Sequence, residues 1–361
     1  MKIERVHFYC RDAARTKDWF VYNIGFKAIG KYVDGHTYTE LVVLNSACFL
    51  ISSPLNDKSP VAQYLACHPT GVADITFRVK NLGAIIDRSM NLGLNILQNI
   101  ELRRSPQGTT FKSAKITGWN DLQHTLIEAE DDLDLCLPMA IEPYQDGDVS
   151  PSHITGIDHV VLNVARGQLS CAVELYQKLF NFKVQQSFDI KTSRSGLTSQ
   201  ALIDDSKEVQ FNINQPSGAN SQIQEFIDYN GGSGIQHLAL RSQNLIADIA
   251  QIQSSLKFLT IPQTYYQNLK ALSYLNLAER EAVARQQILV DSDYTRPQSL
   301  LMQIFTQPIF EQPTFFLEFI ERRQSARGFG RGNFKALFEA VEKQSEHRLS
   351  IQTEDKKTVH S

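Results

Sequence analysis

The chain has 361 residues, of which 42% are hydrophobic and 21% are charged, a balance typical of soluble globular proteins. Its 36 basic and 39 acidic residues give a formal net charge of -3, and like charges form no long run, so nucleic acid is not expected as a partner. The chain contains no stretch of about 18 apolar residues, so the sequence predicts no membrane span. A chain of this length predicts two domains of ordinary size.

The first residues, MKIERVHFYCRD, carry scattered charges and no apolar core, so we expect no secretory signal. The chain has five cysteines, an odd number without a CxxC pair. This pattern favours small buried thiols in a reducing compartment over a disulfide framework or a zinc site, and predicts a cytoplasmic protein. The cysteines are Cys10, Cys48, Cys67, Cys136 and Cys171.

The first half begins with a strand pattern, ERVHFYCRD, followed by a helical pattern over residues 14–26. An apolar run ending in SACFLISSPLND and a further strand pattern, TGVADITFRVKNL at 70–82, complete its first elements. The 70–82 segment aligns without a gap to SGIQHLALRSQNL at 233–245, which predicts an internal repeat. The matching pairs are Gly71/Gly234, Val72/Ile235, Ile75/Leu238, Arg78/Arg241, Asn81/Asn244 and Leu82/Leu245.

Periodicity breaks down at residues 137–156, where three prolines and a polar cluster predict the boundary between the halves. Beyond it DHVVLNVAR aligns with ERVHFYCRD and SCAVELYQKLFNF again predicts a helix, so the second half repeats the order of the first. The residues after 349 are polar and predict a tail.

Two histidines distinguish the second half from the first. His159 and His237 lie in apolar strand patterns, and the repeat places Arg5 and Asp74 at the same positions of the first half. A histidine in a strand is most often a structural residue, but two at equivalent positions of repeated modules raise the hypothesis of a metal site. Only the second half would then bind the metal.

A hairpin near residue 310 offers a third ligand. LLMQIFT and TFFLEFIE predict two antiparallel strands, and alternation places Phe316, Glu318 and Ile320 on one face. A carboxylate with apolar neighbours needs a cation or a partner. Two imidazoles and a carboxylate form the facial triad of non-haem Fe(II) oxygenases, with three positions left for substrate and dioxygen. The alternative is a surface glutamate paired with an arginine, Arg322 or Arg323.

A symmetric hairpin would place Gln303 opposite Glu318 and Phe305 opposite Phe316. In the strand pattern EVQFNIN, the amides Gln210, Asn212 and Asn214 alternate with apolar residues. Composition favours a half-exposed strand with these amides in water. In a curved sheet whose apolar face is covered by helices, the same amides would instead line the interior. Gln222 begins a helical pattern, which in the same way leaves open whether its side chain faces water or the interior.

The segment RGFGRGNF, residues 327–334, raises the alternative of a phosphate-binding loop. Its glycine spacing is not GxGxxG, and it follows the second arm of a hairpin instead of opening a βα unit. We therefore interpret the glycines as a hinge into the helical pattern FKALFEAVEKQ, with Phe329 and Phe334 placed to stack on an aromatic substrate. The segment would act as a lid that keeps water from the metal site.

The motifs GIDHVVLN, SQIQEFIDYNGGSGIQHLAL, LLMQIFTQP, PTFFLEFIERR and GFGRGNFKALFEAVE together resemble the 4-hydroxyphenylpyruvate dioxygenase family of the vicinal oxygen chelate superfamily. The resemblance covers about 150–345 closely and 1–140 mainly in architecture. It implies an α+β fold of two domains, each an open β-barrel of paired βαβββ modules, with a C-terminal helix closing the catalytic barrel. We expect a metal-free domain at 1–145, a catalytic domain at 146–349 and a polar tail at 350–361.

The resemblance implies one Fe(II) per chain, held by His159, His237 and Glu318, the residues reached above from pattern alone. It also implies catalytic positions and substrate-binding positions in the same cavity. The catalytic positions are Gln303, Asn214, Gln222 and Ser199. The substrate-binding positions are Phe305, Phe316, Phe329, Asn333, Phe334 and Gln236, of which Gln236 ranks lower because alternation turns it away from His237. The chain has Asn212 where many members have proline.

The implied reaction joins 4-hydroxyphenylpyruvate and dioxygen to give homogentisate and CO2, through oxidative decarboxylation, ring hydroxylation and side-chain migration. A homo-oligomer without nucleic-acid or membrane partners is expected. One alternative is 4-hydroxymandelate synthase, which hydroxylates the benzylic carbon of the same substrate; Asn214 favours the dioxygenase. Others are a metal- or ligand-binding module without activity, or an extradiol dioxygenase or glyoxalase-type enzyme, which would not be expected to share GFGRGNF.

Overall fold

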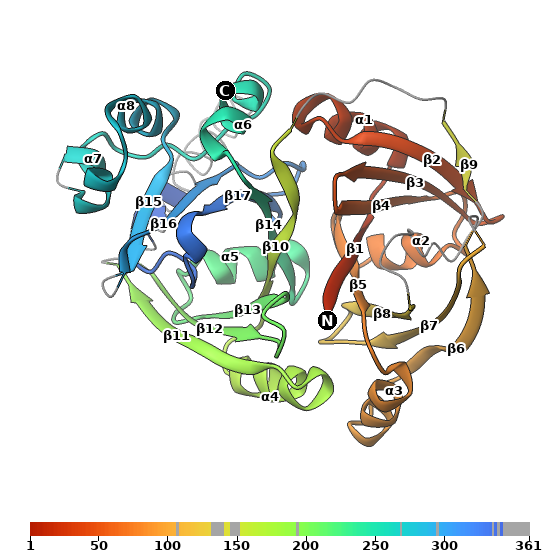
Figure 1. Cartoon of the computed structure of the whole chain (residues 1–361). Coiled ribbons are helices and arrows are strands. Elements are labelled where there is room, and N and C mark those ends of the chain that lie inside the picture. Colours follow the sequence, from red (N-terminus) through yellow and green to blue (C-terminus); the bar gives the residue numbers. More distant parts are fainter. Residues whose placement is uncertain are drawn as a thin grey trace, which may run out of the picture.

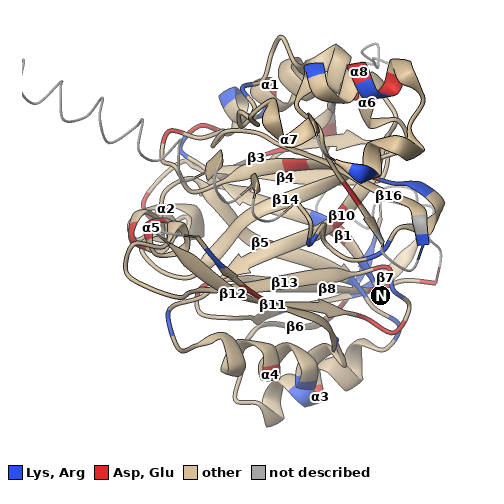
Figure 2. Ribbon diagram, turned by 90° about the vertical axis from the view of Figure 1, so that its left-hand side faces the viewer, with Lys and Arg blue, Asp and Glu red and all other residues tan. Residues whose placement is uncertain are grey.

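The computed structural model describes residues 1–105, 108–130, 141–144, 152–192, 195–267, 269–293, 296–333, 336–337 and 340–341. It contains two large curved sheets that lie side by side, one from each half of the chain (Figure 1). Most helices lie above and below the sheets in the view turned by 90° (Figure 2), whereas the helix that begins at Gln222 borders the cavity of the second half. The fold is α+β, as predicted.

The first half has nine strands and three helices among the described residues. They are β1 (Lys2–Tyr9), α1 (Ala13–Ile24), β2 (Lys27–Val33), β3 (Thr37–Leu44), β4 (Ala47–Pro54), α2 (Pro60–Leu65), β5 (Gly71–Arg78), α3 (Leu82–Asn91), β6 (Ile96–Arg104), β7 (Thr110–Thr117), β8 (Gln123–Glu128) and β9 (Glu142–Pro143).

The second half also opens with a strand and a helix, followed by further strands. Its elements are β10 (Ile154–Asn163), α4 (Leu169–Phe180), β11 (Lys183–Lys191), β12 (Gly196–Ile203), β13 (Gln210–Pro216), α5 (Gln222–Asn230), β14 (Gly234–Ser242), α6 (Leu245–Ile252), α7 (Thr264–Gln267), η1 (Lys270–Tyr274), α8 (Leu277–Gln286), β15 (Leu289–Asp293), β16 (Arg296–Phe305), β17 (Phe316–Arg322) and η2 (Arg323–Ser325).

Each sheet is built from two βαβββ modules. The strand order of the first is β6-β7-β8-β5-β1-β4-β3-β2-β9, and that of the second is β11-β12-β13-β10-β14-β17-β16-β15. In both sheets the opening strands of the two modules lie next to each other and run antiparallel. The predicted repeat is therefore a repeat of modules.

The sequence repeat also explains how helices begin. Asn81 and Asn244, one of the matched pairs, are the N-cap residues of α3 and α6. Their side chains accept hydrogen bonds from the backbone N–H groups of Ala84 and Ala247 at 2.9 and 3.2 Å. Such caps satisfy N–H groups that the helix itself leaves without a partner.

One core runs through both halves. Phe8 and Phe315 lie edge to face with ring centroids 5.2 Å apart, and Phe77 contacts Phe180 at 5.0 Å. Tyr176 of α4 packs on Phe211 of β13 at 4.6 Å, so α4 covers the apolar face of that strand. The opposite face of the second sheet is therefore free to form an enclosed polar site.

The C-terminal helix predicted after residue 334 lies mostly outside the described residues, and so does the tail. Residues 336–337 and 340–341 are helical, and Leu337 and Val341 line a cavity of the second half. Among the helices that the structure describes, none combines the length and the apolar character needed to cross a membrane.

Candidate metal centre

Three buried side chains meet on the inner face of the second sheet. His159 comes from β10, His237 from β14 and Glu318 from β17, and one ligand atom of each lies within 4.8 Å of the others. β14 lies between β10 and β17, so three neighbouring strands supply the three groups. Among the described residues this is the only cluster of three such groups that could hold a metal.

Strand register accounts for this convergence. Ala239 of β14 pairs with His159 on one side and with Glu318 on the other. Directly paired residues of neighbouring strands place their side chains on the same face. Because the methyl group of Ala239 is small, the imidazole and the carboxylate meet above it, and His237 lies two residues earlier on the same strand and face.

The distances suit a metal ion. Glu318 Oε2 lies 3.2 Å from His159 Nε2 and 3.5 Å from His237 Nε2. Around a six-coordinate first-row metal with bonds of about 2.1 Å, adjacent donors lie about 3 Å apart. Two imidazole nitrogens and one carboxylate oxygen on one side of the ion leave three further positions open. The donor set is the one that non-haem Fe(II) enzymes use.

The electrostatics of the three groups are strongly coupled. Burial would raise the pKa of Glu318, but His159 and His237 outweigh it and lower the pKa to about 2. Burial would lower the pKa of His159, yet the charge of Glu318 and the hydrogen bond to Asp158 raise it to about 9. Burial lowers the pKa of His237. A metal that binds here would replace the proton on Nε2 of His159, the nitrogen that faces Glu318.

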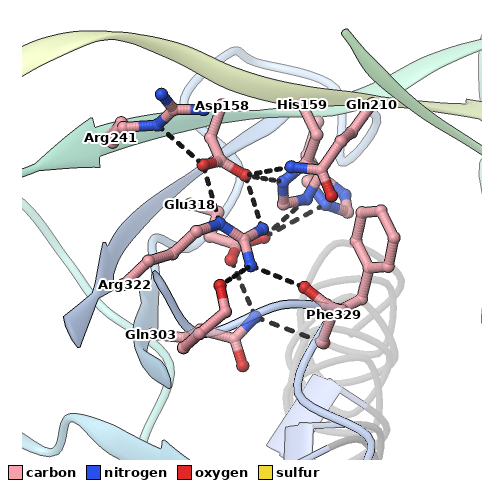
Figure 3. Close-up of polar contacts among 11 residues, drawn as sticks. Asp158, His159, Gln210, Arg241, Gln303, Glu318, Arg322 and Phe329 are labelled. Carbon is pink, nitrogen blue, oxygen red and sulfur yellow. Dashed lines mark hydrogen bonds and ion pairs between the residues drawn. The ribbon is translucent and has the colours of Figure 1, made fainter. Parts of the chain in front are cut away.

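A chain of amides links Glu318 to a more distant tyrosine. Gln303 Nε2 donates to Glu318 Oε1 at 2.8 Å, and Gln303 Oε1 accepts from Asn333 Nδ2 at 2.9 Å. Asn333 Oδ1 in turn accepts from the hydroxyl of Tyr265 at 2.7 Å. Each amide has its donor and acceptor sides fixed by the next group, so the orientation of Gln303 beside the ligand is set. Figure 3 shows the amide of Gln303 joined to Glu318 and to the backbone oxygen of Phe329.

The predicted hairpin exists, but its predicted register is wrong by two residues. Gln303 pairs with Ile320, and Phe305 pairs with Glu318. The same register continues past β16, where the N–H of Thr306 donates to the carbonyl oxygen of Leu317 and the hydroxyl of Thr306 accepts from the N–H of Leu317. A shift of two keeps every side chain on its face, so Gln303 still reaches Glu318 diagonally.

Nearly all of the predicted site residues line one cavity beside the triad. It is lined by His159, Ser199, Asn214, Gln222, Gln236, His237, Gln303, Phe305, Phe316, Glu318 and Phe329. Asn333 contacts this group through Gln303. Phe334 lies outside the described residues.

Gln236 and His237 both line the cavity although they are adjacent in a strand. His237 pairs with Val161 and Ile235 pairs with Leu162, which leaves Gln236 as an extra residue. Such a β-bulge turns neighbouring side chains toward the same side. The alternation argument that turned Gln236 away from the site is therefore wrong.

The amides of β13 lie inside the sheet and not in water. Asn212 and Asn214 are buried and line the cavity, while Phe211 and Ile213 face the core. Asn214 Nδ2 donates to Asn163 Oδ1 at 3.2 Å. The half-exposed strand that composition favoured is wrong, because α4 covers the apolar face.

The glycine-rich segment packs against the same cavity. Gly328 and Gly330 have φ values of +83° and +72°, a region that favours glycine. A Cβ on Gly330 would lie 2.0 Å from Gln303 Oε1, so only glycine permits this approach. The N–H of Gly332 donates to Asp291 Oδ2 at 2.9 Å. A backbone N–H already bound to a carboxylate does not serve as a phosphate ligand.

The equivalent positions of the first half hold a different arrangement. Asp74 is the counterpart of His237, and Lys115 lies 3.4 Å from its Oδ2. Thr125, which the parallel pairing of β5 with β8 makes the counterpart of Glu318, donates to the same oxygen at 2.7 Å. An internal ion pair thus takes the place of a metal site.

Sequence reasoning missed several residues of the site. Nothing in the pattern pointed to Tyr265, which is 68 positions from its partner Asn333. Ala239 and Asp158 stood inside quoted motifs without being singled out. The apolar lining adds Val161, Ile190, Leu197, Ile223, Leu337 and Val341.

Comparisons with known proteins find relatives of this chain in sequence and in structure. Residues 156–272 match the family described as the Glyoxalase/Bleomycin resistance protein/Dioxygenase superfamily. A 4-hydroxyphenylpyruvate dioxygenase of Dictyostelium discoideum is 31% identical over 96% of this chain and 99% of its own length. One from Caenorhabditis briggsae is 32% identical over 96% and 93%. The structure also resembles a triple mutant of 4-hydroxymandelate synthase from Streptomyces coelicolor, with a TM-score of 0.84, 25% identity and coverage of 95% and 98%.

Proposed function

Because the chain belongs to the 4-hydroxyphenylpyruvate dioxygenase family, we propose that it is an Fe(II)-dependent enzyme that converts 4-hydroxyphenylpyruvate and dioxygen to homogentisate and CO2. The observation that carries the proposal is the convergence of His159, His237 and Glu318 beside a cavity with aromatic walls. One Fe(II) per chain, held by these three residues, supplies the positions where the 2-oxo acid and dioxygen bind and the electrons that activate dioxygen.

The chain's own residues then bind and orient the substrate. Phe305, Phe316 and Phe329 form the aromatic wall against which the ring of the substrate packs. Gln303, held by Asn333, presents a fixed amide next to the metal ligand Glu318. A substrate held in one orientation reacts without the entropy loss of a free encounter.

The polar lining that β13 contributes to the cavity suits a phenol. Asn212 Oδ1 is buried and has no hydrogen-bond partner among the described residues, so it is an acceptor ready for an O–H donor. Asn214 uses its Nδ2 on Asn163, which leaves its oxygen for a substrate donor as well. Ser199, Gln222 and Gln236 add neutral polar groups to the same lining. Neutral amides and hydroxyls favour a phenol or a keto group over a phosphate.

The second candidate is 4-hydroxymandelate synthase, which the similarity in structure favours as well. Both reactions need the same substrate and the same triad, so the wall around the ring decides between them. Asn214 supports the ring-hydroxylating reaction.

One experiment separates these candidates. Metal-free protein is reconstituted with Fe(II), given 4-hydroxyphenylpyruvate under oxygen, and the products are identified by chromatography. Homogentisate and CO2 in equal amounts are expected. 4-Hydroxymandelate would select the synthase, and an absence of oxygen uptake would overturn both.

We also propose that the chain divides into domains at 1–145 and 146–349, which the two separate sheets support. Limited proteolysis tests the division, since a first cut in the proline-rich boundary predicted at residues 137–156 is expected. A homo-oligomer remains a prediction, and light scattering coupled to size-exclusion chromatography measures it.

A further inference from the structure

A buried carboxylate lies behind the first histidine of the triad. Asp158 has no exposed surface, and its Oδ1 is 2.9 Å from His159 Nδ1 (Figure 3). The same oxygen accepts from Arg322 Nη2 at 2.6 Å and from Gln210 Nε2 at 3.4 Å. Its Oδ2 accepts from Arg241 Nε at 3.0 Å and from Arg322 Nε at 2.9 Å. A carboxylate bound by two arginines accepts only, so Nδ1 of His159 carries the proton and Nε2 is left for the metal.

Arg322 extends this anchor to the glycine-rich segment. Its Nη1 donates to the carbonyl oxygens of Gly328 at 2.7 Å and Ala326 at 3.4 Å. The residue after Gly328 is Phe329, whose ring lies edge-on to His159 with centroids 5.1 Å apart. The guanidinium of Arg322 therefore binds both Asp158, the partner of His159, and the glycine-rich segment, whose Phe329 packs on the ring of His159.

The second histidine is held in another way. His237 Nδ1 is buried without a hydrogen-bond partner among the described residues. Its ring stacks on Phe316 with centroids 4.6 Å apart and planes inclined by 20°. Charge and hydrogen bonds thus orient one imidazole, and packing orients the other.

The first half provides an internal comparison. Glu4 is the counterpart of Asp158, Arg78 is the counterpart of Arg241, and the two form a double contact at 2.7 and 2.9 Å. A carboxylate–arginine pair between the two opening strands is thus common to both halves and belongs to the architecture.

The residues that make the two other contacts of Asp158 occur only in the half with the metal ligands. The parallel pairing of β8 with β5 matches that of β17 with β14 and makes Ala129 the counterpart of Arg322. Arg5 stands where the second half has His159. The bonds of Asp158 to His159 and to Arg322 are therefore additions to the shared pair.

We propose that Asp158 and Arg322 are positioning residues, which fix the tautomer and direction of His159 for the metal and hold the glycine-rich segment against it. This inference rests on the proposed function, because it takes the triad as a metal site. Loss of such an outer partner typically weakens metal binding by about 10- to 100-fold.

The test measures Fe(II) binding to the metal-free full chain under anaerobic conditions, by competition with a chromophoric chelator. The absorption spectrum of bound Co(II) reports the ligand geometry independently of turnover. The variants are Asp158→Asn, Arg322→Met and the conservative Arg322→Lys. Glu4→Gln and Arg78→Met are matched controls, since they break the shared pair in the half without metal ligands.

We expect Asp158→Asn and Arg322→Met to weaken Fe(II) binding by about 10- to 100-fold and to shift the Co(II) spectrum, with partial recovery in Arg322→Lys. Both controls should lower the unfolding temperature and leave the Kd unchanged. If Asp158→Asn does not fold, the two Arg322 variants decide the result.

A wild-type Kd and Co(II) spectrum in Arg322→Met would overturn the inference, and so would an equal loss of affinity in Glu4→Gln. The proposed function fails separately, since in that case the wild-type chain itself would not bind Fe(II).

Discussion

Acid is expected to destabilise the protein through His124, a buried histidine of β8 that joins the two halves. Its Nδ1 lies 3.3 Å from the carbonyl oxygen of Ile75, and its Nε2 lies 3.0 Å from the hydroxyl of Tyr176 in α4. One hydrogen on Nδ1 satisfies both contacts, with Nε2 as the acceptor of the tyrosine proton. Burial lowers the pKa of His124 from 6.5 to about 4.

The size of the effect follows from these two values. The unfolded chain takes up a proton near pH 6.5 and the folded chain only near pH 4, so the unfolded state binds more protons between them. Stability therefore falls as the pH falls through this window. Between pH 8 and pH 5 the loss through His124 amounts to about 2 kcal/mol, from 1.36 kcal/mol per pKa unit.

The variant His124→Gln isolates this contribution. Glutamine keeps a donor and an acceptor but does not titrate, so groups elsewhere contribute equally to both proteins. Urea unfolding followed by circular dichroism at pH 5 to 8 gives the comparison. The variant loses ring contacts with Phe77 and Phe180, so the difference in slope is the quantity to read. Parallel pH curves for the two proteins would refute the reasoning.

Three further outcomes are expected. Glu318→Ala and His237→Ala should each bind no Fe(II) and consume no oxygen while the far-ultraviolet circular dichroism stays unchanged; metal content near one per chain would contradict the triad. Truncation after Gln324 should raise KM and lower kcat, because it removes the glycine-rich segment from the cavity; unchanged kinetics would rule out its role as a lid. Tyr265→Phe should cost about 1 kcal/mol by freeing Asn333, a roughly fivefold rise in KM, measured by steady-state oxygen uptake; an unaltered KM would show that the amide chain holds without it.

The sequence was sufficient to predict the triad because the repeat supplied a reference. His159 and His237 stood out against Arg5 and Asp74 at equivalent positions, and alternation placed Glu318 among apolar neighbours. The same pattern predicted that the two halves repeat each other, and the family resemblance implied that each half consists of paired βαβββ modules. These features depend on local periodicity, which can be read within each of the segments concerned.

Other features depend on irregularities that periodicity does not encode. The bulge at Gln236 brings an extra side chain to the cavity. The register of the hairpin, which the loop sets and alternation leaves open by two, places Gln303 opposite Ile320 and not Glu318. The bond between Asp158 and Arg322 joins residues 164 positions apart. The repeat did indicate the neighbouring pair of Asp158 and Arg241, because Glu4 and Arg78 carry the same charges at the equivalent positions of the first half.

The ion pair between Asp74 and Lys115 shows how two copies of one module can balance charge differently. The first half supplies its own positive charge at the place where the second half awaits an ion. The charge of Asp74 is therefore balanced by a side chain of the same half. In the second half the corresponding place is lined by two imidazoles and a carboxylate, which leaves the balancing cation to come from outside the chain. Duplication of the module thus gave one copy a fixed internal charge and the other an exchangeable one.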